Sequence, residues 1–446
     1  MGTWIEKQFH LHENQTTVRR ELAGGCTTFL TMSYIIFVQP VMLANTGMDT
    51  GAVMTATCLS SAAATFLMAF LANYPIALAP AMGHNVFFTF MVCGAMGIPW
   101  QTALGAILIS GTCFIILSLV GLRKMVMDSI PDSLKFAIAV GIGLMIALLG
   151  FQWSGVVVKN EATLISIGTL TRPYVLVSGM GLLVSMILTC MNLRGSILFG
   201  IATSAVAAWS YGLVSYHGLM SFPPPSLAPT FMELRPLAAL QLNLAAVILV
   251  FFVLDLFDTI GTLVGVAELG GFMRNGQLPR ARPALLSDAI GTVVGAVLGT
   301  STVSSYIESC SGISDGARTG LASVVTGSLF ILALFFYPLV EMLGQGIAVP
   351  GGGPMVYPVI APALIMVGFI MMRGVKHIPW EDPTESLPAF LTILLTAFSF
   401  SITEGIAFGF MSYSLLKILS GRVRDLHPVM LIISILFVFR YFFLAF

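Results

Sequence analysis

Two aspartates lie within an apolar segment that is long enough to cross a membrane. The segment from Val250 to Gly265 reads VFFVLDLFDTIGTLVG, and its Asp255 and Asp258 are three residues apart, so they share a helix face. A third acid, Glu308, lies in another otherwise uncharged stretch, GTSTVSSYIESCSG. A carboxylate at membrane depth costs at least about 2.5–3.5 kcal/mol. We therefore expect these acids to line a polar cavity of the kind that transport requires.

The composition places the chain among multi-pass membrane proteins. Of its 446 residues, 57% are hydrophobic and only 9% are charged, and the mean hydropathy is +0.95. A soluble domain carries about 25% charged residues, so this chain could not cover a soluble surface. The net charge of zero argues against a nucleic-acid partner. The first 24 residues are polar, and we read no signal peptide in them.

Neither cofactor nor metal chemistry is indicated by the sequence. The six histidines are dispersed, no HExxH motif occurs, and no nucleophile is paired with a base. We therefore predict no enzyme activity, no catalytic residue, no metal and no cofactor. The cysteines form no CxxC pair and are interpreted as small packing residues (Cys26, Cys58, Cys93, Cys113, Cys190 and Cys310).

The hydropathy pattern predicts many membrane-crossing helices of about 20 residues each. The candidate spans are 25–45, 53–72, 101–121, 133–151, 174–191, 196–216, 244–267, 285–299, 318–339, 354–372, 387–403, 404–419 and 427–446. Two shorter pieces, 81–97 and 308–316, follow the extended-looking stretches ANYPIALAP and GTSTVSSYI. We interpret these two pieces as half-helices that begin inside the membrane.

The basic residues predict the orientation of the chain. If the half-helices count as crossings, only Lys159, Arg172 and Arg235 lie opposite the main group of Lys and Arg, and Arg440 is not placed. By the positive-inside rule the amino terminus is then cytoplasmic. The count reaches fourteen crossings by Leu419 and leaves 427–446 over. Either 427–446 lies along the surface, or 387–419 is a single broken span.

An internal repeat relates the two halves of the chain. Residues 59–71, LSSAAATFLMAFL, match residues 286–298, LSDAIGTVVGAVL, without gaps, and the same offset aligns Glu308 with Ala81. An odd number of spans in each copy inverts the second copy relative to the first. Inverted repeats with broken helices place a substrate site near the midplane, where the half-helices begin.

Several side chains near these two starts could bind a flat, nitrogen-rich ligand. A carboxylate can accept N–H groups from the edge of a base, and an amide such as Asn85 can both donate and accept. Phe87 could stack on a flat ring, and Tyr306 and Thr262 are included among the predicted substrate-binding residues. Either Asp258 or Glu308 could also gain and lose a proton and so couple uptake to the proton gradient.

The same residues could instead have purely structural roles. Glu308 could merely cap a helix, and Asp258 could form a buried ion pair, for which Arg318 is the only nearby candidate. Gly261 and Gly265 form a small-xxx-small pair, which favours close helix packing over ligand contact. A histidine in the first half-helix, His84, could shuttle protons or simply pack.

Long motifs along nearly the whole chain resemble the AzgA-type purine permeases of the nucleobase–ascorbate transporter superfamily. They are ELAGGCTTFLTMSYIIFVQP, NYPIALAPAMGHNVFF, LFDTIGTLVGVAELGG, GTSTVSSYIESCSGISDGARTGL and FSITEGIAFGFMSYSLLK. The resemblance implies an all-α fold of fourteen segments in two inverted seven-segment repeats. It also implies a core domain that moves against a gate domain, and purine/proton symport.

The resemblance also assigns residues and domains. Asp258 and Glu308 match the acids that bind the base, Asp255 and Asn85 match polar residues important for transport, and Thr262 falls where a related branch has a proton-linked histidine. We expect a cytoplasmic segment at 1–24 and repeats at 25–217 and 218–446. The core would comprise about 25–124 and 244–339, and the gate about 133–217 and 354–446.

These observations predict a proton-coupled importer of a purine nucleobase in the inner membrane of a bacterium. The stretches TESLPAF and SITEGIAFGF are closer to the adenine-transporting branch, so adenine is favoured, with guanine or hypoxanthine as the alternative. An anion carrier or channel of the same architecture is the alternative of another class, against which the two acids argue. The partners expected are the base, protons and the lipid bilayer, and the sequence leaves open whether the chain forms a homodimer.

Overall fold

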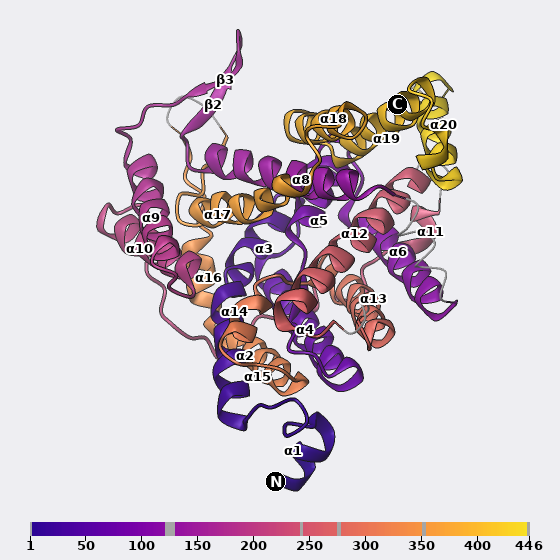
Figure 1. Cartoon of the computed structure of the whole chain (residues 1–446). Helices are drawn as coiled ribbons and strands as arrows, with labels where there is room; N and C mark the ends of the chain where they lie inside the picture. Colours follow the sequence, from indigo (N-terminus) through magenta and orange to yellow (C-terminus); the bar gives the residue numbers. More distant parts are fainter. Residues whose placement is uncertain (1, 121–129, 241–243, 274–277, 350–353, 444–446) are drawn as a thin grey trace. The chain divides into compact units, whose positions relative to one another are not determined.

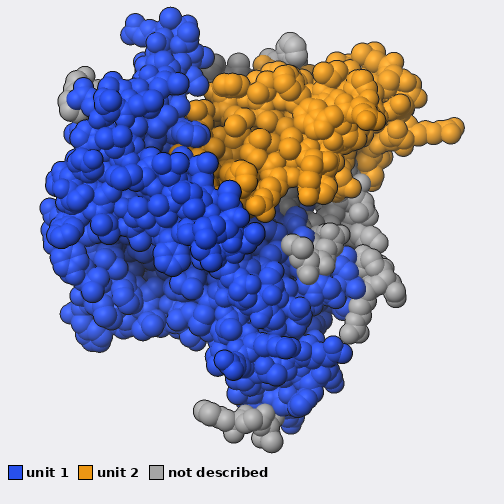
Figure 2. Space-filling view, turned by 60° about the vertical axis from the view of Figure 1, so that its left-hand side comes forward, with its two compact units in different colours: residues 1–119, 150–363 blue, residues 120–149, 364–446 orange. Residues whose placement is uncertain are grey.

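The computed structural model describes residues 2–120, 130–240, 244–273, 278–349 and 354–443. The chain divides into two compact units, one of Met1–Leu119 and Gly150–Ala363 and the other of Val120–Leu149 and Leu364–Phe446 (Figure 2). These boundaries differ from the predicted core and gate, and that division stays a prediction.

Unit 1 holds most of the helices (Figure 1). Its first half contains α1 (Gly2–Phe9), α2 (Val18–Met32), α3 (Ile35–Ala44), α4 (Thr50–Leu67), the π-helical η1 (Met68–Ala72), β1 (Leu78–Pro80), α5 (Met82–Val86), the π-helical η2 (Phe87–Ala95) and α6 (Trp100–Val120). The hairpin of β2 (Val157–Asn160) and β3 (Leu164–Ile167) follows, and then α9 (Pro173–Cys190), α10 (Ser196–Ser210) and α11 (Pro236–Ala239). Its later part contains α12 (Ala245–Gly270), α13 (Ala281–Leu298), β4 (Val303–Ser305), α14 (Ser309–Ser314), α15 (Gly320–Ala333), η4 (Leu334–Phe336) and α16 (Tyr337–Leu343).

Unit 2 is built around a pair of helices that fold back on each other. It contains most of α8 (Asp132–Trp153) and of α17 (Ala361–Met372), followed by η5 (Arg373–His377), α18 (Pro383–Ser399), α19 (Ile402–Leu419), η6 (Val423–Asp425) and α20 (Pro428–Phe443). The chain reverses after α18 at Phe400, which has a left-handed backbone (φ 51°). A Cβ on Gly405 would lie 2.8 Å from the Thr392 carbonyl, so glycine allows α18 and α19 to pack closely.

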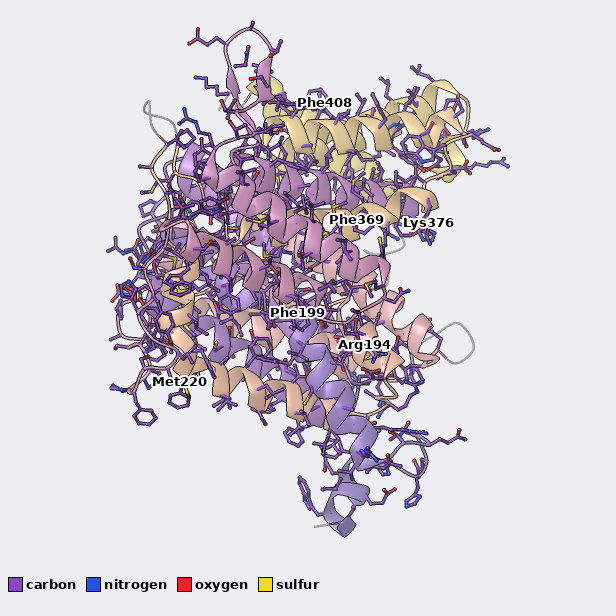
Figure 3. All side chains as sticks on the ribbon, turned by 90° about the vertical axis from the view of Figure 1, so that its left-hand side faces the viewer. Arg194, Phe199, Met220, Phe369, Lys376 and Phe408 are labelled. Carbon is purple, nitrogen blue, oxygen red and sulfur yellow. The ribbon has the colours of Figure 1, made fainter. Side chains whose placement is uncertain are left out.

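The described helices fit a membrane environment. Among the described residues, nine helices are long and apolar enough to cross a bilayer, and Ser196–Ser210 and Pro428–Phe439 are shorter apolar helices. Large apolar side chains such as Phe199, Phe369 and Phe408 lie on the surface, with 56%, 50% and 41% of their area exposed (Figure 3). Outward-facing apolar side chains of this kind suit contact with lipid.

The two predicted extended stretches are confirmed, and they pair with each other. Strand β1 runs antiparallel to β4 with Leu78 opposite Ser305, and bonds from Ala81 N–H to Thr302 O (2.9 Å) and from Tyr306 N–H to Ala77 O (3.0 Å) lengthen the ladder. Extended backbone at membrane depth needs such partners because lipid supplies none. A half-helix follows each strand within one to three residues, α5 after β1 and α14 after β4.

The pairing agrees with the internal repeat. Ser305 lies 227 positions after Leu78 (305 minus 78), which is the offset between the matched Leu59 and Leu286. The same offset relates the first residue of α2 to that of α12, and that of α5 to that of α14. In these two helix pairs the two copies therefore agree in where the helix begins, although the helices end at different positions.

Several predicted spans are corrected by the structure. The spans predicted at 25–45 and 318–339 are both found, as Val18–Ala44 and Gly320–Leu343. The first begins earlier than predicted and has a short turn between α2 and α3, and the second comprises α15, η4 and α16. The span at 354–372 is helical only from Ala361. The alternative of a single broken span at 387–419 is wrong, because α18 and α19 lie against each other. The first half-helix continues as π-helix after Val86.

Candidate functional site

Asp258 and Glu308 are brought together from separate elements of unit 1. Asp258 lies in the middle of α12, and Glu308 immediately precedes α14. Their carboxylates are close enough for their charges to interact. Both side chains are partly exposed, although the polar residues of β4 beside them are buried. Two acids that remain accessible within an otherwise buried region are suited to meeting a ligand.

The Glu308 carboxylate is held by a tyrosine from the break between α2 and α3. The Tyr34 hydroxyl donates to Glu308 Oε1 at 2.9 Å, and the Thr31 hydroxyl lies 3.4 Å from the Glu308 carbonyl oxygen. Tyr34 is buried, with 2% of its area exposed. The Glu308 side chain makes no capping bond to α14, so the capping interpretation of this acid is wrong.

Asp258 is surrounded by hydroxyl groups rather than by cations. The Ser304 hydroxyl bonds to its side chain. Thr262, one turn later, donates to the Asp258 carbonyl oxygen (2.7 Å) and lies 2.5 Å from the Ser305 hydroxyl, which ties α12 to β4. Ion pairs within the described part of the chain include neither Asp258 nor Glu308. The Arg318 guanidinium instead donates to the carbonyl oxygens of Ile313 in α14 and of Ala317 after it.

Two further aspartates are buried behind this pair. Asp255 is completely buried, and the Thr292 hydroxyl lies 3.3 Å from its Oδ2. Asp288 of α13 is equally buried and accepts the Thr259 hydroxyl at 2.7 Å and the Ser305 N–H at 3.0 Å. Asp288 was not among the residues predicted from the sequence, although its position in an apolar span was the same signal that identified Asp258.

Asn85 belongs to a buried polar network that joins the two half-helix regions. Its amide nitrogen donates to Gln39 Oε1, and its amide oxygen accepts from the Ser301 hydroxyl. The Gln39 amide in turn donates to the Thr300 hydroxyl at 3.0 Å. All four side chains are completely buried. The Asn85 amide is therefore engaged by protein groups, and Gln39 is a partner that was not predicted from the sequence.

The two predicted aromatic residues also make internal contacts. Phe87 packs edge-to-face on Phe251 of α12 with ring centroids 5.0 Å apart, and 1% of its area is exposed. The Tyr306 hydroxyl donates to the Pro80 carbonyl oxygen at 2.6 Å and so links β4 to the end of β1. Both residues shape the region around the two acids.

Comparison with known proteins identifies the family. A model of a family described as a permease family matches residues 19–412. The chain belongs to this permease family. It is 44% identical to the adenine permease AdeP of Escherichia coli, over 98% of this chain and 95% of that one. It is 42% identical to the guanine/hypoxanthine permease PbuO of Bacillus subtilis, over 98% of this chain and 100% of that one.

The fold of this permease is also found in a solved transporter. The transmembrane domain of a cyanobacterial bicarbonate transporter, BicA, matches with a TM-score of 0.61 at 15% identity, covering 88% of this chain and 97% of that one. This likeness bears on the fold alone. It confirms the predicted class, an all-α multi-pass membrane protein built from inverted repeats. The sequence resemblance to the AzgA-type purine permeases is confirmed by the family match and the relatives.

Proposed function

We propose that this permease imports a purine nucleobase together with protons. The main support is the meeting of Asp258 and Glu308, two accessible acids beside paired strands, without a cation bound to either among the described ion pairs. The names of the relatives, which are adenine and guanine/hypoxanthine permeases, point to the same class of substrate.

The chemistry of the two acids suits a base. Each carboxylate can accept N–H groups from the edge of a purine, and charge-assisted bonds of this kind are about twice as strong as neutral ones. The hydroxyls of Tyr34 and Ser304 hold the two carboxylates from the protein side. An anion would be repelled by the same pair, so this site argues against an anion carrier of similar fold.

Proton coupling follows from placing two like charges together. A low-dielectric site with two nearby carboxylates favours the uptake of a proton by one of them. Binding of the proton and of the base would then be linked, because both use the same two carboxylates, and the protonation state of the pair sets how many N–H groups it can accept. We assign the proton to Asp258, with Glu308 as the alternative, and Asp255, Asn85, Thr262, Phe87 and Tyr306 to the surroundings of the base.

The membrane arrangement completes the proposal. The amino terminus would be cytoplasmic in a bacterial inner membrane, and the core would carry the base past the gate. The motif resemblance favours adenine as the base. Identities of 44% and 42% to relatives of the two purine classes do not separate adenine from guanine or hypoxanthine. A homodimer is compatible with this arrangement.

Uptake measurements in cells that lack their own purine permeases test the proposal. Cells making this protein should accumulate radiolabelled adenine, with competition by unlabelled purines and loss of accumulation when a protonophore is added. If adenine, guanine and hypoxanthine all fail to enter or compete, the substrate class is wrong. If accumulation survives the protonophore, purine transport stands and proton symport is wrong.

A further inference from the structure

In the described part of the structure, no close packing contact requires a glycine at position 261 of α12. It lies in the middle of a 26-residue helix, where glycine is a poorer helix former than alanine. It is exposed, and a Cβ built on it would meet no atom of the described residues within 4 Å. The packing role predicted for the Gly261 and Gly265 pair is therefore wrong for Gly261.

Other glycines in the same bundle show what a packing requirement looks like. A Cβ on Gly291 of α13 would lie 2.7 Å from the Ala64 Cβ, and a Cβ on Gly295 would lie 2.9 Å from the Ser301 carbonyl oxygen. A Cβ on Gly265 would make ordinary contact with Ile307 at 3.4 Å. Gly261 differs from all three because it borders open space.

The open space lies beside one of the two accessible acids. Gly261 follows Asp258 by three residues, so the two positions are neighbours on one side of α12. Asp258 itself is partly exposed. The missing side chain thus widens the space immediately next to a carboxylate that a ligand can reach.

The internal repeat shows what a side chain does at the equivalent position. The offset of 227 that relates Leu59 to Leu286 and the first residue of α2 to that of α12 pairs Gly261 with Tyr34 (261 minus 227). In the first copy this position carries a buried ring whose hydroxyl holds Glu308. In the second copy this position carries no side chain, and no atom of the described residues lies within 4 Å of the place of its Cβ.

We propose that Gly261 is a specificity-determining residue, whose missing side chain leaves room for the ring system of the bound base. This inference rests on the proposed function, since it names the residue that sets the width of that same site. A side chain at position 261 would take volume from the base, and the loss would grow with the size of the side chain.

A graded series with a matched control tests this inference. Gly179 of α9 is also a mid-helix glycine whose Cβ would meet nothing within 4 Å, but it lies in a different helix from both acids. Gly261→Ala should raise the KM for purine uptake severalfold, and Gly261→Val and Gly261→Leu should raise it at least tenfold or stop uptake. The same three substitutions at Gly179 should leave the KM unchanged, with all six variants present in the membrane at wild-type amounts.

A chemical probe separates a ligand cavity from a lipid-facing surface. In a transport-competent variant without the six native cysteines, Gly261→Cys should react with a water-soluble maleimide, and adenine or hypoxanthine should slow that reaction. Wild-type KM in Gly261→Leu, or an introduced thiol that is unreactive or not protected by a transported purine, would overturn the inference while purine transport stands. Failure of the wild-type protein to take up any purine would instead refute the proposed function.

Discussion

Removing the Tyr34 hydroxyl should weaken base binding without disturbing the fold. Tyr34→Phe keeps the buried ring and deletes only the donor that lies 2.9 Å from Glu308 Oε1. A hydrogen bond to a charged group contributes about 1.5–3 kcal/mol. Glu308 is partly exposed, so water can replace part of this bond and the lower end of the range applies. Since about 1.4 kcal/mol corresponds to a tenfold change, we expect the KM for purine to rise about tenfold.

The assay compares Tyr34→Phe with a matched tyrosine in unit 2. The Tyr413 hydroxyl also donates to a glutamate, Glu385, at 3.3 Å, but that glutamate is already bound by Lys417 at 2.7 Å. Tyr413→Phe should leave the KM within about twofold of wild type, because the charged partner of Glu385 remains. The pH dependence of uptake should shift in Tyr34→Phe and not in Tyr413→Phe. Only Tyr34→Phe removes a hydrogen bond from Glu308, an acid proposed to bind the base. An unchanged KM and an unchanged pH profile in Tyr34→Phe would refute the reasoning.

Three further substitutions probe the acids and the buried amides. Glu308→Gln should abolish or nearly abolish purine uptake with normal amounts of protein in the membrane, and normal uptake would exclude its role in binding. Asp258→Asn should block accumulation against a gradient, measured with an imposed pH difference across proteoliposomes; unchanged accumulation would exclude Asp258 as the proton carrier. Gln39→Leu leaves the buried Asn85 amide without its acceptor, which should cost about 1–3 kcal/mol and lower the melting temperature in a thermal-shift assay. An unaltered melting temperature would show that this network does not stabilise the protein.

Patterns within single segments of the sequence predicted much of the fold. Apolar segments long enough to span a bilayer were visible directly, and short extended-looking stretches marked both half-helices, with prolines in the first stretch and serines and threonines in the second. The break between α2 and α3 was missed because no proline or glycine lies at Ser33 and Tyr34. The bond between Tyr34 and Glu308 joins residues 274 positions apart, and no periodicity in the sequence indicates such a contact.

The candidate site was only partly predictable, because it too depends on contacts between residues far apart in the sequence. Asp258 and Glu308 were conspicuous because charge is rare in apolar segments, and this signal applied equally to Asp288. Which of the acids remain accessible depends on the packing of β4 against α12 and α13, which leaves Asp288 buried and Asp258 partly exposed. The emptiness beside Gly261 likewise depends on tertiary structure, because glycine in a helix is equally compatible with close packing and with open space.

The two repeats contain similar helices and strands, but the two acids of the proposed site both come from one of them. Positions related by the offset of 227 pair Thr31 with Asp258 and Ala81 with Glu308, so both accessible acids come from the second copy. The first copy supplies a hydroxyl, from Tyr34, to orient one of them. If both acids accept N–H groups of the base, the base should bind with its N–H edge toward the second copy. The repeated scaffold accounts for the paired strands and half-helices, whereas the substitutions that break its symmetry account for the site.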